Sequence, residues 1–154
     1  MTSREGMELG VVERETGKRE EPLWVHRFDI AGVAGAIPEA RRRISAAAAS
    51  LGLEGTALFE LLFAVGEALT NAVKHGSPRG ELDRVYVAVG VCSGGVAVQI
   101  SDQGQGFADT PACHPDAMAS TGRGIPFMRS LSDEFRFDCA EGGTRVLLVK
   151  LLDE

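Results

Sequence analysis

The stretch VGEALTNAVKHG, residues Val65–Gly76, decides how the rest of the chain is interpreted. As a helix it places Glu67 and Asn71 one turn apart and His75 a further turn along. On a helical wheel Glu67 and Asn71 lie about 40° apart, nearly opposite a stripe of Leu and Val side chains. Such a polar ladder is either a solvated helix face or part of a binding site, and the pair alone favours the solvated face.

The helix that contains this stretch is predicted to span about residues 56–75. Gly76 is a typical residue at a helix C-terminus. Because Phe63 and Ala64 share the face of Glu67, that face is not simply a wet surface, and both interpretations stay open. The apolar stripe recurs at intervals of three and four residues, as in an amphipathic helix, and consists of Leu58, Leu61, Leu62, Val65, Leu69 and Ala72.

The other predicted elements are recognised by their periods and by turn residues between them. We expect a strand at 23–30, a helix from Pro38 to about Gly52, a hairpin of 84–91 and 96–101, a helix from about Ile125, and strands at 134–139 and 144–152. Short turns make both strand pairs antiparallel. The order predicts an α+β fold, a two-layer sandwich in which helices cover one face of a mixed, mainly antiparallel sheet.

Composition limits the possible classes of protein. The 154 residues suit one domain, which we place at 22–154 after a flexible charged head at 1–21. The net charge of −6 does not favour nucleic acid as a partner. There is no apolar run of about 18 residues, so no membrane span is predicted. The three cysteines are few and far apart, which favours a reducing cytoplasm.

Two glycine-rich motifs could contact a ligand. In DQGQGF, Asp102 ends a strand, and the glycines that follow allow a sharp turn and a close backbone approach. In TGRGIPFM, which starts at Thr121, glycines precede a helix, whose free N–H groups favour anions. Each motif alone is weak evidence, because Asp/Gly turns and Gly-containing loops are common. Between them, residues 108–120 include Cys113 and His114, whose spacing from nearby aspartates is poor for a metal site.

Taken together and in this order, the motifs resemble a known superfamily. EALTNAVKHG, DQGQGF, GRGI and GGTRVLLV stand where gyrase, ninety-kilodalton heat-shock chaperones, sensor histidine kinases and mismatch-repair ATPases carry their ATP-binding boxes. The resemblance covers roughly 23–152. From this sequence we expect neither a phospho-accepting histidine hairpin ahead of this domain nor a further domain after it. The chain is therefore most similar to the bacterial anti-sigma factor serine/threonine kinases, which stand alone.

The resemblance implies a role for each matching residue. Glu67 corresponds to the general base, and Asn71 to the residue that binds the Mg²⁺ bridging the ATP phosphates. Asp102 corresponds to the acceptor of the adenine amino group, which Thr144 supports. The remaining cofactor-binding residues implied are Gly104 and Gly106 at the base, Gly122 and Gly124 at the phosphates, and Arg123 and Lys74 as possible phosphate contacts. His75 matches a frequent family position, although it also suits a helix C-terminus.

Three functions remain open from the sequence. The first is an ATP-dependent serine kinase that sequesters a sigma factor and phosphorylates a small antagonist protein. The second is a binding module that uses ATP to switch partners without phosphoryl transfer. The third is a related switch kinase that acts on a stress-signalling scaffold and does not bind sigma. The presence of Glu67 and Asn71 favours the first. A homodimer is expected from the resemblance alone.

Overall fold

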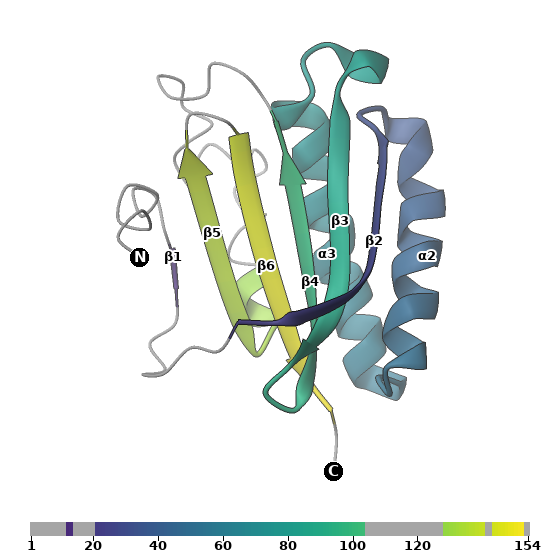
Figure 1. Ribbon diagram of the computed structural model, residues 1–154, viewed down its shortest axis with the longest axis vertical. Helices are drawn as coiled ribbons and strands as arrows, with labels where there is room; N and C mark the ends of the chain where they lie inside the picture. Colours follow the sequence, from purple (N-terminus) through teal and green to yellow (C-terminus); the bar gives the residue numbers. More distant parts are fainter. Residues whose placement is uncertain (1–11, 14–20, 104–127, 141–142, 153–154) are drawn as a thin grey trace.

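We describe the protein from a computed structural model, which describes residues 12–13, 21–103, 128–140 and 143–152. These residues form two layers, a sheet and a pair of helices on one of its faces (Figure 1). The elements are β1 (Val12–Glu13), β2 (Leu23–Ala31), η1 (Ala34–Ala36), α2 (Ile37–Ser50), α3 (Gly55–Gly76), η2 (Gly80–Leu82), β3 (Arg84–Cys92), β4 (Gly95–Asp102), β5 (Glu134–Ala140) and β6 (Gly143–Leu151). The predicted two-layer α+β sandwich is confirmed.

The sheet has the strand order β1-β5-β6-β4-β3-β2. Both predicted hairpins are present, with Val89 opposite Val98 and Phe137 opposite Val146. The pairing of β4 with β6 joins the two hairpins and places both strands at the centre. The sequence predicted a mixed sheet, but every pair among the described strands is antiparallel.

The first strand lies within the segment that was predicted to be a charged head. Val12 pairs with Phe137 and Glu13 with Arg136, at the sheet edge formed by β5. Two residues are too few to show an alternating pattern, so no pattern in the sequence predicts this strand. The rest of residues 1–20 lies outside the described residues.

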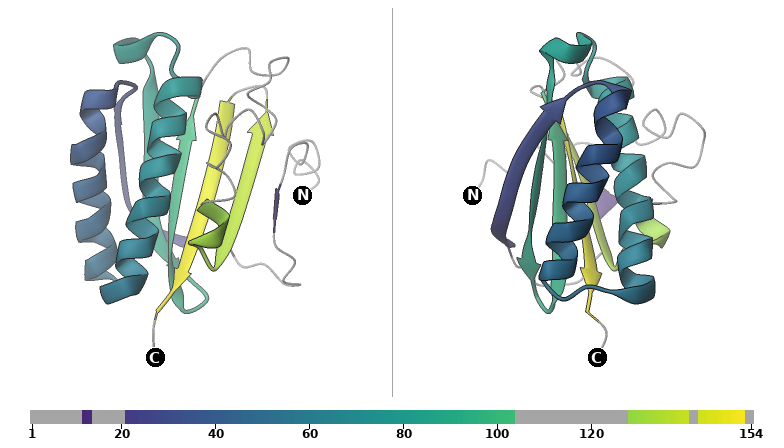
Figure 2. Two further views of the ribbon diagram at one scale, coloured as in Figure 1. Left: turned by 180° about the vertical axis from the view of Figure 1, so that it is seen from behind. Right: turned by 90° about the vertical axis from the view of Figure 1, so that its right-hand side faces the viewer.

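The core lies between the sheet and the helices. Val87, Val98 and Leu148 point from three central strands toward α3, and Phe135 and Phe137 extend the same layer from β5. On α3 the predicted stripe is the packed face: Leu61, Val65, Leu69 and Ala72 are buried, while Leu58 and Leu62 are half-buried against the core. Figure 2 shows α2 and α3 side by side on this face.

Helix α3 is apolar enough to resemble a membrane span. It has 22 residues, and an 18-residue window within it has a mean hydropathy of 1.3. The helix is not an uninterrupted apolar run, since Glu67 and Asn71 lie within it. Nearly half of that window is buried inside the protein, and its Leu and Val side chains pack on the sheet. This is the pattern of a core helix.

The opposite face of the sheet is partly covered by the chain itself. The first part of β2 runs across the front of the sheet before turning up along β3 (Figure 1). There Trp24 packs on Cys92, Ala97, Leu147 and Val149. The register of β2 against β3 shifts between Trp24 and His26, which allows this bend.

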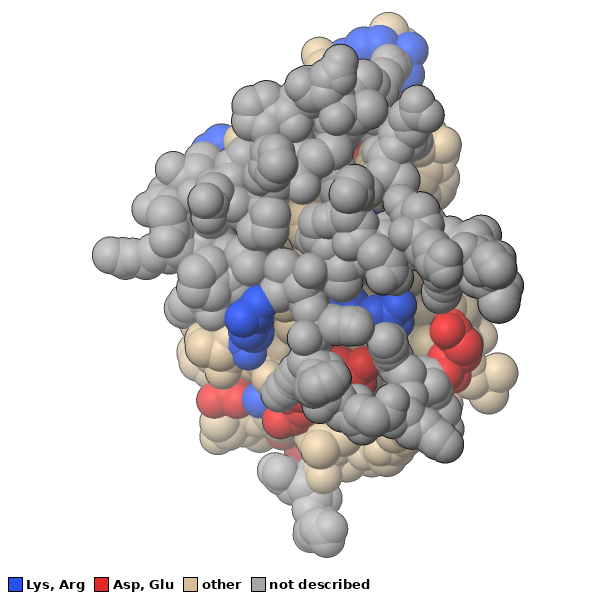
Figure 3. Space-filling model, turned by 90° about the vertical axis from the view of Figure 1, so that its left-hand side faces the viewer, with Lys and Arg blue, Asp and Glu red and all other residues tan. Residues whose placement is uncertain are grey.

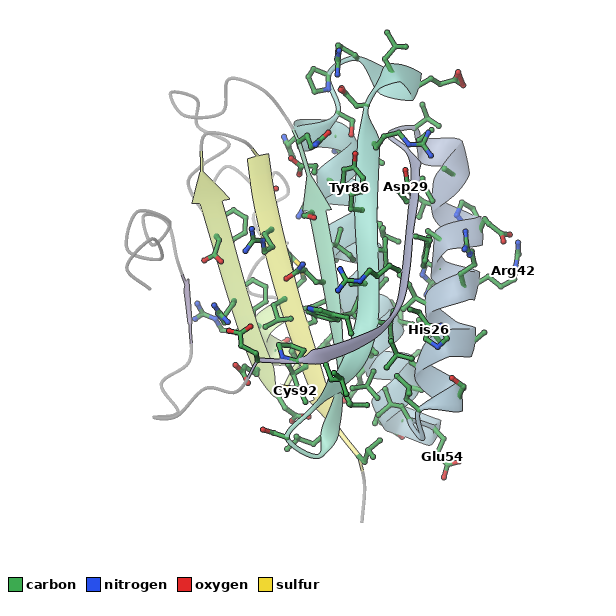
Figure 4. The ribbon with its side chains drawn as sticks, viewed as in Figure 1. His26, Asp29, Arg42, Glu54, Tyr86 and Cys92 are labelled. Atoms are coloured by element: carbon green, nitrogen blue, oxygen red, sulfur yellow. The ribbon has the colours of Figure 1, made fainter. Side chains whose placement is uncertain are left out.

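Higher on the same face, polar side chains remain accessible. Tyr86 and Asp29 lie on the side of the sheet away from the helices (Figure 4) and line a shallow hollow of about 430 Å³. At the β1–β5 edge, the described Lys and Arg side chains are interspersed with Asp and Glu (Figure 3). The described part of that face therefore shows no patch of a single charge.

Candidate functional site

Three chain segments meet at one end of the helix-covered face. They are the end of α3, the end of β4 and the start of β6. Asp102, the last residue of β4, is buried and accepts two hydrogen bonds from Thr144 on β6. Thr144 Oγ1 donates to Asp102 Oδ2 at 2.5 Å, and the Thr144 amide donates to Asp102 Oδ1 at 3.3 Å. The two residues assigned to the adenine site therefore lie in direct contact.

Two glycines bring the backbone close to Asp102. A Cβ on Gly76, at the end of α3, would lie 2.2 Å from the Asp102 carboxyl carbon. A Cβ on Gly143 would lie 2.0 Å from the Asp102 carbonyl oxygen, and Gly143 has φ +133°, which disfavours other residues. The end of α3 therefore lies against the Asp102 carboxylate, and the start of β6 lies against the Asp102 backbone.

The polar ladder of α3 is not a solvated face. Asn71 is only 4% exposed, and no described residue gives a hydrogen-bond partner to its buried Nδ2 atom. Glu67, one turn earlier, is half-buried. Because a buried amide without a partner costs free energy, Asn71 is a candidate for a ligand contact. The solvated-face interpretation is therefore wrong for Asn71.

His75 lies one turn beyond Asn71, and its buried Nε2 atom likewise has no hydrogen-bond partner among the described residues. Burial lowers the pKa of His75 below its ordinary value of 6.5, and the adjacent Lys74 lowers it further, while Asp102 acts in the opposite direction. The imidazole is therefore neutral at pH 7. Lys74 is exposed beside it. His75 thus lies close enough to Asp102 for the carboxylate charge to affect the pKa of the imidazole.

The end of α3 is held in place by the loop that follows. Ser77 Oγ donates to the Ala72 carbonyl oxygen at 3.0 Å, which satisfies one of the last helix carbonyls. Arg79 then donates its amide and two guanidinium N–H groups to the Asp83 carboxylate, at 2.6–2.9 Å. The backbone and side-chain bonds from Arg79 lower the pKa of Asp83. These bonds order the end of α3 and the loop that follows it.

The remaining predicted ligand contacts are not described. Gly104, Gly106, Gly122, Arg123 and Gly124 all fall within 104–127, as do Cys113 and His114. Their assignments stay predictions. Among the described residues, no group of three His, Cys, Asp or Glu side chains is arranged to hold a metal ion.

This arrangement of residues occurs within a match to a known protein family. A sequence profile of the histidine kinase-like ATPase domain matches residues 31–150, which is most of the chain and includes every residue named in this candidate site. The chain belongs to the histidine kinase-like ATPase family. Members of this family use ATP, and the helix end that carries Asn71 and the strand end that carries Asp102 both lie within the match.

Curated relatives within this family include bacterial regulators. The chain is 28% identical over 138 residues to the anti-sigma F factor of Clostridium botulinum, covering 83% of this chain and 96% of the relative. It is 29% identical over 123 residues to the serine-protein kinase RsbW of Bacillus subtilis, covering 73% and 76%. These relatives are named as an anti-sigma factor and a serine-protein kinase. The predicted resemblance is confirmed.

A solved structure shares the fold. The crystal structure of the RsbU and RsbW domains of a Mycobacterium tuberculosis protein aligns with a TM-score of 0.60 and 19% identity. The alignment covers 84% of this chain and 33% of that one, so the chain spans about a third of that protein. At this identity the comparison shows that the two proteins share a fold and shows nothing more.

Sequence reasoning missed two residues that shape the site. The sequence predicts Gly76 only as the end of a helix and Gly143 only as part of the GGTRVLLV motif, with no contact to Asp102 for either. The signal for Gly76 is its position directly after the polar residues of α3. A glycine there either ends the helix or allows another chain segment to approach its backbone closely. Neither contact with Asp102 could be derived without knowing that β4 ends beneath α3.

Proposed function

We propose that this chain is an ATP-dependent protein serine/threonine kinase that acts as an anti-sigma factor and phosphorylates a small antagonist protein. The observation that carries the proposal is the buried, unpaired amide of Asn71 one turn from half-buried Glu67. The helix that holds both residues ends against the Asp102 carboxylate. The names of the curated relatives support both the kinase and the anti-sigma parts.

In this proposal Asp102 recognises the base of ATP. The ionised carboxylate of Asp102 accepts hydrogen bonds, and the adenine amino group is a donor that such a carboxylate would bind. Thr144 holds the carboxylate in one orientation, which lowers the cost of ordering it when ATP binds. Asp102 is buried, so the bond that it accepts is stronger than one in water.

Mg²⁺ is proposed as the metal that accompanies ATP. Asn71 fits this role because its amide is buried and its Nδ2 is unpaired, and a rotated amide would present its oxygen instead. One neutral oxygen ligand suits Mg²⁺, which usually takes few protein ligands and completes its shell with phosphates and water. The metal would supply charge neutralisation at the phosphates.

Glu67 is proposed to accept the proton of the attacking serine or threonine hydroxyl. It is one turn from Asn71 on the same helix, about 6 Å along the axis, which places a base beside the phosphate-binding position. Phosphoryl transfer depends mostly on positioning and on charge stabilisation, so one base and a held phosphate are sufficient protein chemistry. We further propose cofactor contacts from Lys74, Arg123 and the glycines of both loop motifs.

The proposed partners are a sigma factor and its antagonist, with no direct contact to nucleic acid. The net charge of −6 argues against binding to a phosphate backbone. We propose a homodimer on the resemblance alone, and a cytoplasmic location on the few, widely separated cysteines. The alternative is a partner-switching module that binds ATP without transferring phosphate. The following experiment distinguishes the two.

The test is incubation of the full chain with labelled ATP, Mg²⁺ and candidate antagonist proteins, followed by mass spectrometry. We expect phosphate on a serine or threonine of one antagonist. Nucleotide binding with no phosphorylated product would support the binding-module alternative. A calorimetric titration without any nucleotide binding would contradict the whole proposal.

A further inference from the structure

A shallow hollow of about 430 Å³ lies on the face of the sheet away from the helices, where β2, β3 and β4 run side by side. Its volume is at the lower end of the range for small-molecule sites. In the strand register, the side chains that line it form two adjacent rows, which are Asp29, Tyr86 and Ser101, and Arg27, Ala88 and Gln99. Regular strands therefore build the hollow.

A small side chain between larger ones creates the hollow. Ala88 is 6% exposed, and its direct neighbours across the sheet are Arg27 on one side and Gln99 on the other. Tyr86, two residues before Ala88 on the same strand, is 38% exposed and lies on this face (Figure 4). The floor is therefore apolar and one wall is aromatic, which suits a flat apolar group.

The acidic side chain among the lining residues is already paired. Asp29 Oδ2 accepts a hydrogen bond from Arg84 Nε at 2.9 Å. Arg27 is exposed, and its direct neighbour across the sheet is Ala88 and not an acid. Among the described residues Arg27 takes part in no ion pair. The hollow therefore has a guanidinium to which the described part of the chain gives no counter-ion.

The surrounding charges add to this preference for an anion. Arg145 is exposed on β6 directly opposite Ser101, and it too is in no ion pair between described residues. Asp138 lies opposite Arg145 on its other side, on β5. The three arginines and two aspartates around the hollow leave one net positive charge, in a chain whose net charge is −6. The hollow therefore attracts anions although the whole chain repels them.

A carboxylate is the anion that these groups fit. The planar guanidinium of Arg27 matches the two oxygens of a carboxylate. Gln99 and Ser101 are half-buried at the hollow, and each has a neutral hydrogen-bond donor for a polar ligand. Only one guanidinium belongs to the lining itself. One positive group matches the single charge of a carboxylate better than the nearly two charges of a phosphate monoester.

The hollow is separate from the proposed nucleotide site. Ser101 and Asp102 are consecutive in β4, so their side chains point to opposite faces of the sheet. Asp102 lies against the end of α3 on the helix-covered face, whereas Ser101 lines the hollow. A ligand in the hollow would therefore not compete with ATP for the same groups.

We propose that the hollow binds a small carboxylic acid with a flat apolar body. Its carboxylate pairs with Arg27, and its body lies on Ala88 beside the ring of Tyr86. This site goes beyond the proposed kinase function and does not depend on it. An acidic side chain of a partner protein offers the same carboxylate without the flat body, and the test separates the two sources.

The test is an NMR titration of the full ¹⁵N-labelled chain with benzoate, benzamide and acetate, followed at the backbone amides of Ala88 and Ser101. Benzoate and benzamide share the flat body and differ in charge, whereas acetate has the charge without the ring and represents an acidic side chain. We expect benzoate to bind at least about threefold more tightly than either of the others. The variant Arg27→Gln should bind benzoate and benzamide equally.

Arg136→Gln is the matched control, because it removes a half-buried arginine of the same face, opposite Leu147 and outside the hollow. It should keep the preference of the wild type for benzoate. Equal binding of benzoate and benzamide, a preference that survives Arg27→Gln, or unmoved signals of Ala88 and Ser101 would each overturn the proposal. Acetate binding as tight as that of benzoate would overturn the flat ligand and favour an acidic side chain. The titration contains no nucleotide, so a failed kinase test would not change its result.

Discussion

The hydroxyl of Thr144 donates to the carboxylate of Asp102 at 2.5 Å, joining the start of β6 to the end of β4 directly beneath the end of α3. The two residues are 42 positions apart in sequence, and neither is exposed by more than 6%. A buried aspartate held in this way is a fixed acceptor. The first prediction follows from this pair.

Thr144→Val keeps the shape of the side chain and removes its hydroxyl. The variant should bind ATP about 5- to 20-fold more weakly, because a buried carboxylate loses a hydrogen bond and becomes less well oriented. Thr144→Ser is the control and should bind nearly as the wild type does. Isothermal calorimetry measures both. Equal affinities for the Val and Ser variants would show that the hydroxyl has no part in nucleotide binding.

Gly76→Ala tests the close approach of α3 to Asp102. The added methyl group would lie 2.2 Å from the carboxylate, so either the helix end or Asp102 must move. We expect a loss of about 1–3 kcal/mol in the free energy of unfolding together with weaker ATP binding. Gly66→Ala is the control on the same helix, because its nearest neighbour would be Arg41 at 3.5 Å.

In contrast, Gly66→Ala should stabilise the protein by up to about 1 kcal/mol, since alanine is the better helix former. Urea unfolding of both variants gives the comparison. If both substitutions changed the free energy of unfolding in the same direction by the same amount, the close contact between Gly76 and Asp102 would not contribute to stability.

His75 should make the stability of the protein depend on pH near neutrality. Burial and Lys74 lower its pKa in the folded state, whereas the unfolded chain keeps the ordinary value of 6.5. As pH falls through 6.5, the unfolded state takes up a proton first, so the free energy of unfolding decreases. His75→Gln removes this component. Urea unfolding at pH 7.5 and about pH 5.5 should show a smaller loss for the variant than for the wild type.

Lys150 should contribute to stability without contacting the nucleotide. Lys150→Met keeps an unbranched side chain but removes the bonds to Glu60 and to the Leu131 carbonyl. We expect a loss of about 1–2 kcal/mol in the free energy of unfolding, with ADP affinity unchanged. A thermal unfolding series with and without ADP measures both effects. A variant as stable as the wild type would contradict the anchoring role.

The parts of this fold that the sequence predicted are those encoded by local patterns. The stripe that includes Leu61, Val65 and Leu69 has the period of a helix, and the alternation in β3 and β4 has the period of a strand. The contact between Asp102 and Gly76 has no such local code. It depends on β4 pairing with β6 and passing under α3, which is a property of the assembled sheet.

Burial was the second property that periodicity could not supply. A wheel places Asn71 nearly opposite the Leu stripe, which suggests solvent, yet the residue is buried because the end of α3 is surrounded by other chain segments. The roles of Glu67 and Asn71 as base and metal ligand came from family resemblance, and they stay predictions. The exposure of Phe59, about two turns before Glu67 on the same helix, is visible only in the structure.

The most direct measurement of the central claim compares Glu67→Ala with Asn71→Ala for both ATP binding and phosphate transfer to the antagonist. Glu67→Ala should bind Mg·ATP within about twofold of the wild type and transfer phosphate about 10²–10⁴-fold more slowly, as expected for a lost general base. Asn71→Ala should lose the Mg²⁺-dependent part of ATP affinity. Equal loss of binding in both variants, or no change in either, would contradict the account.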